Sequence, residues 1–383
     1  MHLCPRSALV GCALALASSP AFAFDAHPAL AVGGAAPSTL AVYGDAPYGT
    51  TPGDDSELKA TPAFIDNVNA DPDVSIVLHV GDIHSGKQYC TEAYDRTIFD
   101  LWRRFDDPLV YTPGDNEWTD CHKAAEGGGT YDAASGTIKY VLDASGSPVD
   151  YANGDPVANL ELVRSIFFPL PGVTLGRHRK LVLSQAEIPS PLHPSDQQFV
   201  ENVMWIQSRV LIVAINLPGG SNDDGDAWYG APTASPTQLA EAQLRDGADL
   251  RWLDLAFTIA EWAHLDGVII QAQADMWDPE KGPAHQTSYE PYVRAVAEHT
   301  TRLGKPVLML NGDSHAYLSD NPLGASDPLA YMHPGYDVAN FHRIVVHGST
   351  FPLEWLKLTI DPKQHAAPSD NAFGPFRWQR ITQ

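Results

Sequence analysis

The segment VSIVLHVGD (residues 74–82) is the clearest of five apolar, strand-like runs that end on an aspartate. The other four are TLAVYGD to Asp45, PLVYTPGD to Asp115, GVIIQAQAD to Asp275 and PVLMLNGD to Asp313. Parallel strands of an open α/β sheet share their carboxyl edge, which is where ligands bind. The sequence therefore predicts that these carboxylates meet at one edge of a sheet.

Carboxylates gathered in this way repel one another unless a positive charge lies among them. A metal site, with two ions, is the simplest explanation of the pattern. Any one of these aspartates is explained almost as well as a helix N-cap, a position that aspartate favours. Asp275 also reads as an ordinary loop acid. The ordered repetition of the pattern is what favours metal binding.

Helical patterns alternate with these runs, which predicts crossover connections and a largely parallel sheet of the α/β class. The helices are expected near residues 64–68, 91–105, 158–168, 238–265 and 289–303. KLVLSQAE (180–187), ENVMWIQ (201–207) and RVLIVAINL (209–217) predict a second, more antiparallel layer. FHRIVVHGS (341–349) and EWLKLTI (354–360) predict two late strands. Residues 124–157 are rich in Gly, Ala and Asp and indicate a surface insertion.

The N-terminus has the pattern of a secretory signal peptide over residues 1–23, with cleavage after Ala23. The alternative is a lipoprotein signal at LVGC, which would leave Cys12 as the lipidated residue. A loose leader is expected over residues 24–38, one domain over 39–362 and a tail over 363–383. No later run is long and apolar enough to span a bilayer. We therefore expect a secreted or periplasmic protein.

Charge and cysteine content agree with export. The 383-residue chain has a formal charge of −23, which argues against a nucleic-acid partner because phosphates need a basic surface. After signal removal two cysteines remain, Cys90 and Cys121. In an oxidising compartment this pair predicts a disulfide, with two unrelated buried thiols as the alternative.

The order of the motifs resembles the calcineurin-like metallophosphoesterase family. The family's blocks are D-x-H, G-D, G-N-H-[DE], a lone His and G-H-x-H. The matching segments here are GDAP (44–47), GDIH (81–84), GDNE (114–117), QAQAD (271–275) and GDSH (312–315). The resemblance covers about residues 39–360. It implies a β-sandwich of two mixed sheets flanked by helices, with a two-metal centre.

The resemblance also implies a ligand set. Asp82 would bridge two divalent ions, with Asp45 and His315 completing one position. Asp115, Asp313 and Asp275 would complete the other, and whether Asp115 or Asn116 faces the metal stays open. Several family histidines are replaced, at Pro47, Asn116, Asp313 and either Asp275 or Gln273. Because oxygen ligands suit hard cations, Mn²⁺, Mg²⁺ or iron is favoured, with Zn²⁺ or Ca²⁺ as alternatives.

The implied activity is hydrolysis of a small-molecule or lipid-derived phosphodiester or phosphomonoester by a hydroxide held between the two ions. Asn116 stands where the family has its catalytic histidine and cannot donate a proton. His84 is the expected substitute acid, with His122 and Tyr48 as weaker alternatives. Glu117 and Tyr48 are expected to support the metal ligands through hydrogen bonds.

Two other functions compete with this interpretation. One is a catalytically silent protein on the same fold that binds a metal or a partner, which the loss of the histidine at Asn116 favours. The other is a serine esterase with Gly312-Asp313-Ser314 as its G-D-S motif. We set the esterase aside because the motif lies late in the chain and no D-x-x-H follows it.

Overall fold

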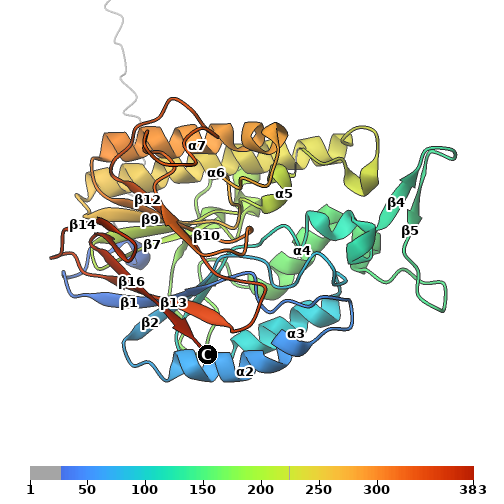
Figure 1. Cartoon of the computed structure of the whole chain (residues 1–383), viewed down its shortest axis with the longest axis horizontal. Coiled ribbons are helices and arrows are strands. Elements are labelled where there is room, and N and C mark those ends of the chain that lie inside the picture. The colour runs from blue at the N-terminus through green and yellow to red at the C-terminus, as the bar shows by residue number, and fades with distance from the viewer. Residues whose placement is uncertain (1–26, 224) are drawn as a thin grey trace, which may run out of the picture.

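The computed structural model describes residues 27–223 and 225–383 (Figure 1). The predicted signal peptide, the lipoprotein alternative at Cys12 and the start of the expected leader lie outside the described residues. The rest of the leader is not loose throughout, because Pro28–Leu30 forms a short 3-10 helix, η1. The side chains of Ala29 and Leu30 are buried in the main core and fix this segment to the domain.

Two seven-stranded sheets pack face to face. The first has the order β14 (Ala366–Ser369), β15 (Ala372–Gly374), β16 (Phe376–Thr382), β13 (Glu354–Ile360), β1 (Ser38–Tyr43), β2 (Val74–His79) and β3 (Leu109–Tyr111). The second has the order β11 (Leu318–Asp320), β12 (Phe341–Val345), β10 (Val307–Asn311), β9 (Gly267–Gln271), β8 (Val210–Ala214), β7 (Val203–Gln207) and β6 (Leu183–Ser184). Both sheets are mixed.

Parallel pairing runs through the part of each sheet that carries the aspartate motifs. In the first sheet β1, β2 and β3 are parallel, and in the second β8, β9, β10 and β12 are parallel. The remaining pairs are antiparallel, including β6–β7–β8 as the sequence predicted. The five aspartates therefore come from two facing sheets, not from one edge as the sequence pattern suggested. Asp45, Asp82 and Asp115 belong to the first sheet and Asp275 and Asp313 to the second.

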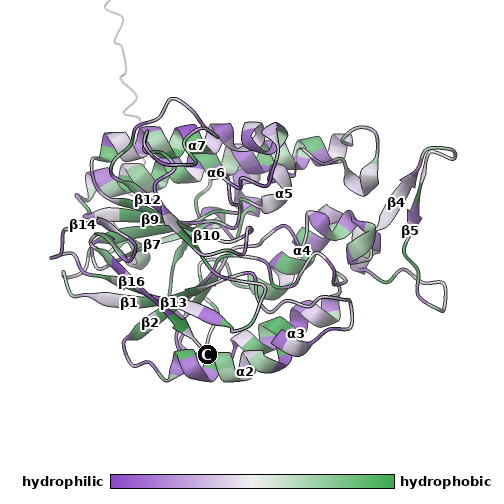
Figure 2. Ribbon diagram, viewed as in Figure 1, coloured by the Kyte–Doolittle hydropathy of each residue, from purple (hydrophilic) through white to green (hydrophobic). Residues whose placement is uncertain are grey.

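The central strands are almost wholly apolar because both of their faces are buried. In β1, Leu40 and Val42 face the second sheet, whereas Ala41 and Tyr43 face the helices on the outer side. Figure 2 shows the same contrast, with hydrophobic residues concentrated in the strands and hydrophilic residues on the outer faces of the helices. The motifs at the strand ends are thus held by a rigid double layer.

Helices cover the outer faces of both sheets (Figure 1). Residues of α2 (Ser56–Asn69), α3 (Glu92–Trp102) and α4 (Pro156–Phe167) pack in the core of the first sheet's outer face, and those of α6 (Pro236–Trp262) and α7 (Pro283–Leu303) in the core of the second. The starts follow capping rules. Ser235 accepts a hydrogen bond from Gln238 N before α6, and Asp155 accepts one from Ala158 N before α4.

Two peripheral segments have more regular structure than the sequence indicated. The segment from residue 363 onward is not a mere tail, because β16 pairs with β13 over seven residues and extends the first sheet. The expected insertion at 124–157 contains a regular hairpin, β4 (Gly129–Asp132) and β5 (Thr137–Tyr140), which projects from the body in Figure 1. The weak hydrophobic periodicity of this segment arises because the two-stranded sheet packs against little of the core.

The expected fold class is confirmed: two mixed sheets form a sandwich that is flanked by helices. Within residues 27–223 and 225–383, no helix combines the length and the apolar character that crossing a bilayer requires.

Candidate metal centre

The aspartate motifs lie where the chain leaves each strand, and several adopt an unusual backbone conformation. Asp45, Asp82, Asp313 and His315 have φ angles of 49°, 61°, 73° and 62°. Positive φ is uncommon for residues other than glycine, and it concentrates at functional sites where the surrounding structure holds it. The turns after β1, β2 and β10 thus hold conformations that the surrounding structure must stabilise.

Asp45, Asp82 and His315 form a compact group of possible ligands. One ligand atom from each lies within 4.8 Å of the others. Asp45 is fully buried, and its Oδ2 has no hydrogen-bond partner. Its Oδ1 accepts a hydrogen bond from Asp313 N at 2.9 Å and lies 3.5 Å from His315 Nε2. A buried, unpartnered carboxylate oxygen beside an imidazole fits a divalent cation.

The electrostatics of the group point the same way. Burial raises the pKa of Asp45, Asp82 and Asp313 well above the usual value, and the charge of Asp115 raises each of them further. Burial lowers the pKa of His315 to about 4, which keeps its imidazole neutral and able to ligate. Two like charges about 4 Å apart repel by about 4 kcal/mol at an effective dielectric constant of about 20. A bound cation would relieve this repulsion.

Asp82 is also held by three neighbouring side chains. Its Oδ2 accepts hydrogen bonds from Tyr48 Oη at 2.5 Å and Asn116 Nδ2 at 3.0 Å. Glu117 Oε1 accepts from Asp82 N at 3.2 Å, from Gly114 N at 2.7 Å and from Tyr111 Oη at 2.5 Å. Burial raises the pKa of Glu117 to about 7. Tyr48 and Glu117 therefore both form hydrogen bonds with Asp82, one with its side chain and the other with its backbone N–H.

Asp115 and Asp313 lie together around a glycine that sequence reasoning missed. A Cβ at Gly219 would lie 2.7 Å from Asp313 Oδ1 and 2.8 Å from Asp115 Oδ2. Only glycine leaves room for both oxygens. Gln273 completes the arrangement, because its Nε2 donates to Asp115 Oδ1 at 3.0 Å and its Oε1 accepts from Gly219 N.

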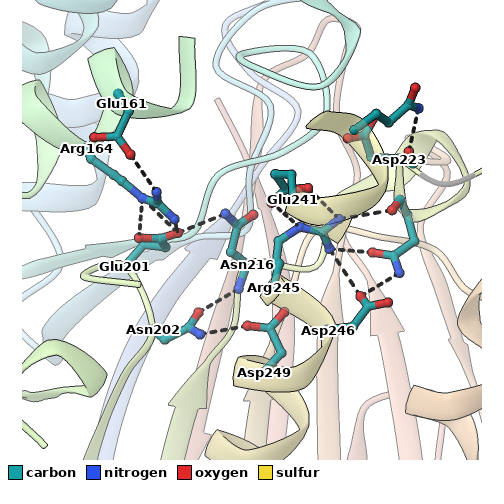
Figure 3. A network of polar contacts seen from close by, with 12 residues as sticks. Glu161, Arg164, Glu201, Asn202, Asn216, Asp223, Glu241, Arg245, Asp246 and Asp249 are labelled. Carbon is teal, nitrogen blue, oxygen red and sulfur yellow. Dashed lines mark hydrogen bonds and ion pairs between the residues drawn. The ribbon is translucent and has the colours of Figure 1, made fainter. Parts of the chain in front are cut away.

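The loop that carries Gly219 is held from behind by a buried polar network. Arg245 of α6 donates to the Oδ1 and the backbone oxygen of Asn222, at 2.5 and 3.0 Å, and its guanidinium lies 5.4 Å from the centre of the Trp118 ring. Figure 3 shows Arg245 beside Glu241 and Asp246 in this network. Trp118 belongs to the turn after Asp115, so Arg245 ties together both loops beside Asp115.

Asp275 does not join the ligand group as expected. It forms a fully buried ion pair with Arg343 of β12, through its Oδ1. The same oxygen accepts from Trp277 N at 3.0 Å, and Oδ2 accepts from Ser314 Oγ at 2.7 Å. Both oxygens therefore already have partners, and we leave Asp275 out of the proposed ligand set. Its backbone N–H holds Asp313 Oδ2 at 3.1 Å.

A cavity of about 580 Å³ opens over the group. Asp82, Asp115, Asn116, Asp313 and His315 line it, together with Tyr48, Lys87, Lys281 and Phe351. The described residues of its wall do not include His84 or His122. His84 is fully buried against Tyr94, with ring centres 5.5 Å apart, and burial lowers its pKa to about 4. The interpretation of His84 as the proton donor is thus not supported by its position.

The predicted Cys90–Cys121 disulfide is confirmed. It joins the segment after Asp82 to the short 3-10 helix η2 (Asp120–His122) that follows Asp115. Both sulfur atoms belong to buried residues. The bond therefore ties together two of the loops that supply the site.

Replacing both Cys90 and Cys121 with serine should lower the free energy of unfolding by about 3–4 kcal/mol, because the bond closes a loop with a sequence separation of 31. Urea denaturation of the variant and of the oxidised wild-type protein measures the difference. As a control, a reductant should weaken the wild type and leave the double variant unchanged. Equal stability of the two oxidised proteins would contradict the prediction.

Comparisons with known proteins give a limited result. No family model matches the sequence, and no curated protein matches it. Among solved structures, a dimetal phosphatase from Danio rerio shares 10% identity, with 90% of this chain and 98% of that chain covered and a TM-score of 0.45. A purple acid phosphatase from yellow lupin (Lupinus luteus) seeds shares 12%, with 91% and 52% covered and a TM-score of 0.40. These likenesses are too low to establish an activity.

Proposed function

We propose that the protein is a divergent calcineurin-like metallophosphoesterase, exported from the cell, that hydrolyses small phosphoesters with divalent metal ions. The observation that carries the proposal is the group formed by Asp45, Asp82 and His315, with an unpartnered buried oxygen, at the base of a cavity of about 580 Å³. Bound cations would supply Lewis acidity and neutralise the charge of the phosphoryl group. The disulfide supports an oxidising compartment.

The cavity wall supports an anionic substrate. Lys87 and Lys281 line it, and neither forms an ion pair with another of the described residues. Lys281 lies close enough to lower the pKa of His315 by its charge. In a chain with a formal charge of −23, free cations at the site attract a phosphoester. The many carboxylates favour a monoanionic diester over a dianionic monoester, because they repel the second charge.

The test is turnover of a nitrophenyl phosphodiester and of nitrophenyl phosphate by the purified protein, with and without a chelator. We expect activity that the chelator removes. Because oxygen ligands predominate, Mn²⁺ or Mg²⁺ should restore the stripped protein at least as well as Zn²⁺ when each is added alone. Recovery with Zn²⁺ only would count against the oxygen-rich ligand set.

Tyr48 replaces His84 as the proposed proton donor to the leaving group. Its hydroxyl lines the cavity, donates to Asp82 and accepts from Asn116 Nδ2 at 2.9 Å. Burial raises its pKa well above the usual value, so the phenol keeps its proton at neutral pH. Tyr48 and Asn116 thus form one hydrogen-bonded unit with Asp82.

Tyr48→Phe should lower the turnover of an alkyl phosphoester by roughly a hundredfold, since alkoxide leaving groups need a proton. Turnover of a nitrophenyl ester should fall much less, because nitrophenolate leaves unprotonated. Steady-state rates on a matched alkyl and nitrophenyl pair measure the effect, and His84→Gln serves as the control for a buried residue off the cavity. Equal losses on both esters would assign Tyr48 to positioning Asp82 instead.

The alternative is a silent metal-binding protein on the same fold. It is favoured by Asn116, which cannot act as an acid, and by the absence of His84 from the described cavity wall. Retained metal without turnover on a broad panel of phosphomonoesters and phosphodiesters would select this alternative.

A further inference from the structure

The two halves of the ligand cluster offer different sets of donor atoms, and only one of them includes an imidazole. In the half formed by Asp45, Asp82 and His315, Asp45 Oδ2 is buried without a partner, and His315 Nε2 lies 3.5 Å from Asp45 Oδ1. Asp82 Oδ1 accepts only a long hydrogen bond, from Asn116 N at 3.4 Å. This half therefore presents the free Asp45 oxygen, the carboxylate of Asp82 and an imidazole as possible ligands of one cation.

The half formed by Asp115 and Asp313 has fewer free atoms. Asp115 Oδ1 is held by Gln273, and Asp313 Oδ2 is held by the backbone N–H of Asp275. One oxygen of each carboxylate remains, and both lie beside Gly219. No imidazole of the described cavity wall belongs to this half, because His315 lies with Asp45.

The bridge between the two halves is also weakened. An ion beside Asp115 would share Asp82 with the first half, but Asp82 Oδ2 already accepts from Tyr48 at 2.5 Å and from Asn116 at 3.0 Å. A cation would have to displace two hydrogen bonds to reach that oxygen. Coordination of a second ion by Asp82 Oδ2 would therefore cost the free energy of these hydrogen bonds.

Asp275, the remaining carboxylate of the five, is neutralised by a cation of the chain itself. Arg343 is fully buried, pairs with Asp275 and Asp320, and lies over the Trp277 ring at 5.3 Å. If Arg343 moved away, the carboxylate of Asp275 would remain buried without its counterion. The Gly219 loop behind Asp115 is fixed as well, through Arg245 and Asn222. Neither side of this half can rearrange easily to supply another ligand.

The geometry points to two unequal cation positions: one ion held tightly by Asp45, Asp82 and His315, and a second that binds weakly between Asp115 and Asp313. This inference rests on the proposed function, since it concerns the same site. It predicts that the purified protein keeps one ion per chain and takes up the second only at higher metal concentration. Arg343 is a positioning residue in this scheme, because it withholds Asp275 from the weak position.

The test uses Mn²⁺ alone as the probe. The full chain is stripped with a chelator, reloaded, passed through a desalting column and analysed for bound manganese, and calorimetric titration measures the two affinities. We expect about one ion retained per chain and a second class at least about tenfold weaker. His315→Ala should lose the retained ion, and its side chain is 38% exposed, so folding should survive. Asp313→Asn should keep the retained ion and lose the weak class.

Two ions retained equally, none retained, or loss of the retained ion in Asp313→Asn but not in His315→Ala would each overturn the inference. Asp100→Asn, on the exposed face of α3, is the matched control and should bind as the wild type does. Turnover at saturating Mn²⁺ is measured separately. Turnover by a protein that binds two ions with equal affinity would reject the unequal positions and keep the proposed function. One tightly bound ion without turnover would keep the unequal positions and reject the proposed function.

Discussion

Asp82→Asn is expected to lower the turnover rate more than about a hundredfold. This loss exceeds the one typical of residues that only support a metal ligand. We propose that both ions share Asp82, which is grouped with Asp45 and His315 and whose pKa the charge of Asp115 also raises after burial. An amide has the same shape but no charge to offer a cation. Steady-state kinetics with saturating Mn²⁺ and metal analysis of the same sample measure the change.

The matched control for this prediction is Asp100→Asn, which makes the same chemical change at a side chain that is 72% exposed. It should leave both turnover and metal content at the wild-type level. Thermal unfolding of the two variants separates loss of function from loss of folding. Asp82→Asn that retains its metal and at least a tenth of the wild-type rate would reject the central role given to Asp82.

Arg343→Met should lower the free energy of unfolding by about 3–5 kcal/mol, because it leaves the carboxylate of Asp275 buried without its counterion. Both side chains of this pair are fully buried. Adding Asp275→Asn to the same chain should recover a large part of the loss, since the amide can still bond to Ser314. Chemical denaturation of the wild type, the single variant and the double variant gives the three values.

Arg302→Met provides the comparison. Its guanidinium is 46% exposed and pairs with Glu261 and Asp254 on the surface, so its removal should cost no more than about 1 kcal/mol. Similar losses of unfolding free energy in Arg302→Met and Arg343→Met would mean that the buried ion pair stabilises the fold no more than the surface pair does. The same result would weaken the argument that Asp275 is unavailable to a metal.

Much of the fold follows from local sequence pattern. The five apolar runs became β1, β2, β3, β9 and β10, and the long helical pattern over residues 238–265 became α6. These elements are long or uniformly apolar, so period and length identify them. What local pattern could not reveal is the division of the runs between two sheets, because strand order depends on pairing over long distances in sequence.

The site shows the same limit. The motifs place Asp45, Asp82 and His315 a few residues beyond the ends of β1, β2 and β10, and the structure brings ligand atoms of the three within 4.8 Å of one another. Gln273 and Gly219 carry no motif, and Gly219 lies in the loop beyond β8, where no local signal marks it. The pairing of Asp275 with Arg343 spans 68 residues of sequence, and nothing local indicates it. His84 misled because nearness in sequence to Asp82 does not fix the direction of a side chain.

The antiparallel pairing of β1 with β13 determines how late in synthesis the first sheet can be completed. Thr39 and Thr359 are hydrogen-bonded neighbours although 320 residues separate them. At about 5–20 residues per second, a ribosome needs roughly 16–64 s to deliver the later strand. Until then one edge of β1 stays open, and open strand edges recruit other chains. The first sheet can therefore be completed only after both ends of the domain are available to pair.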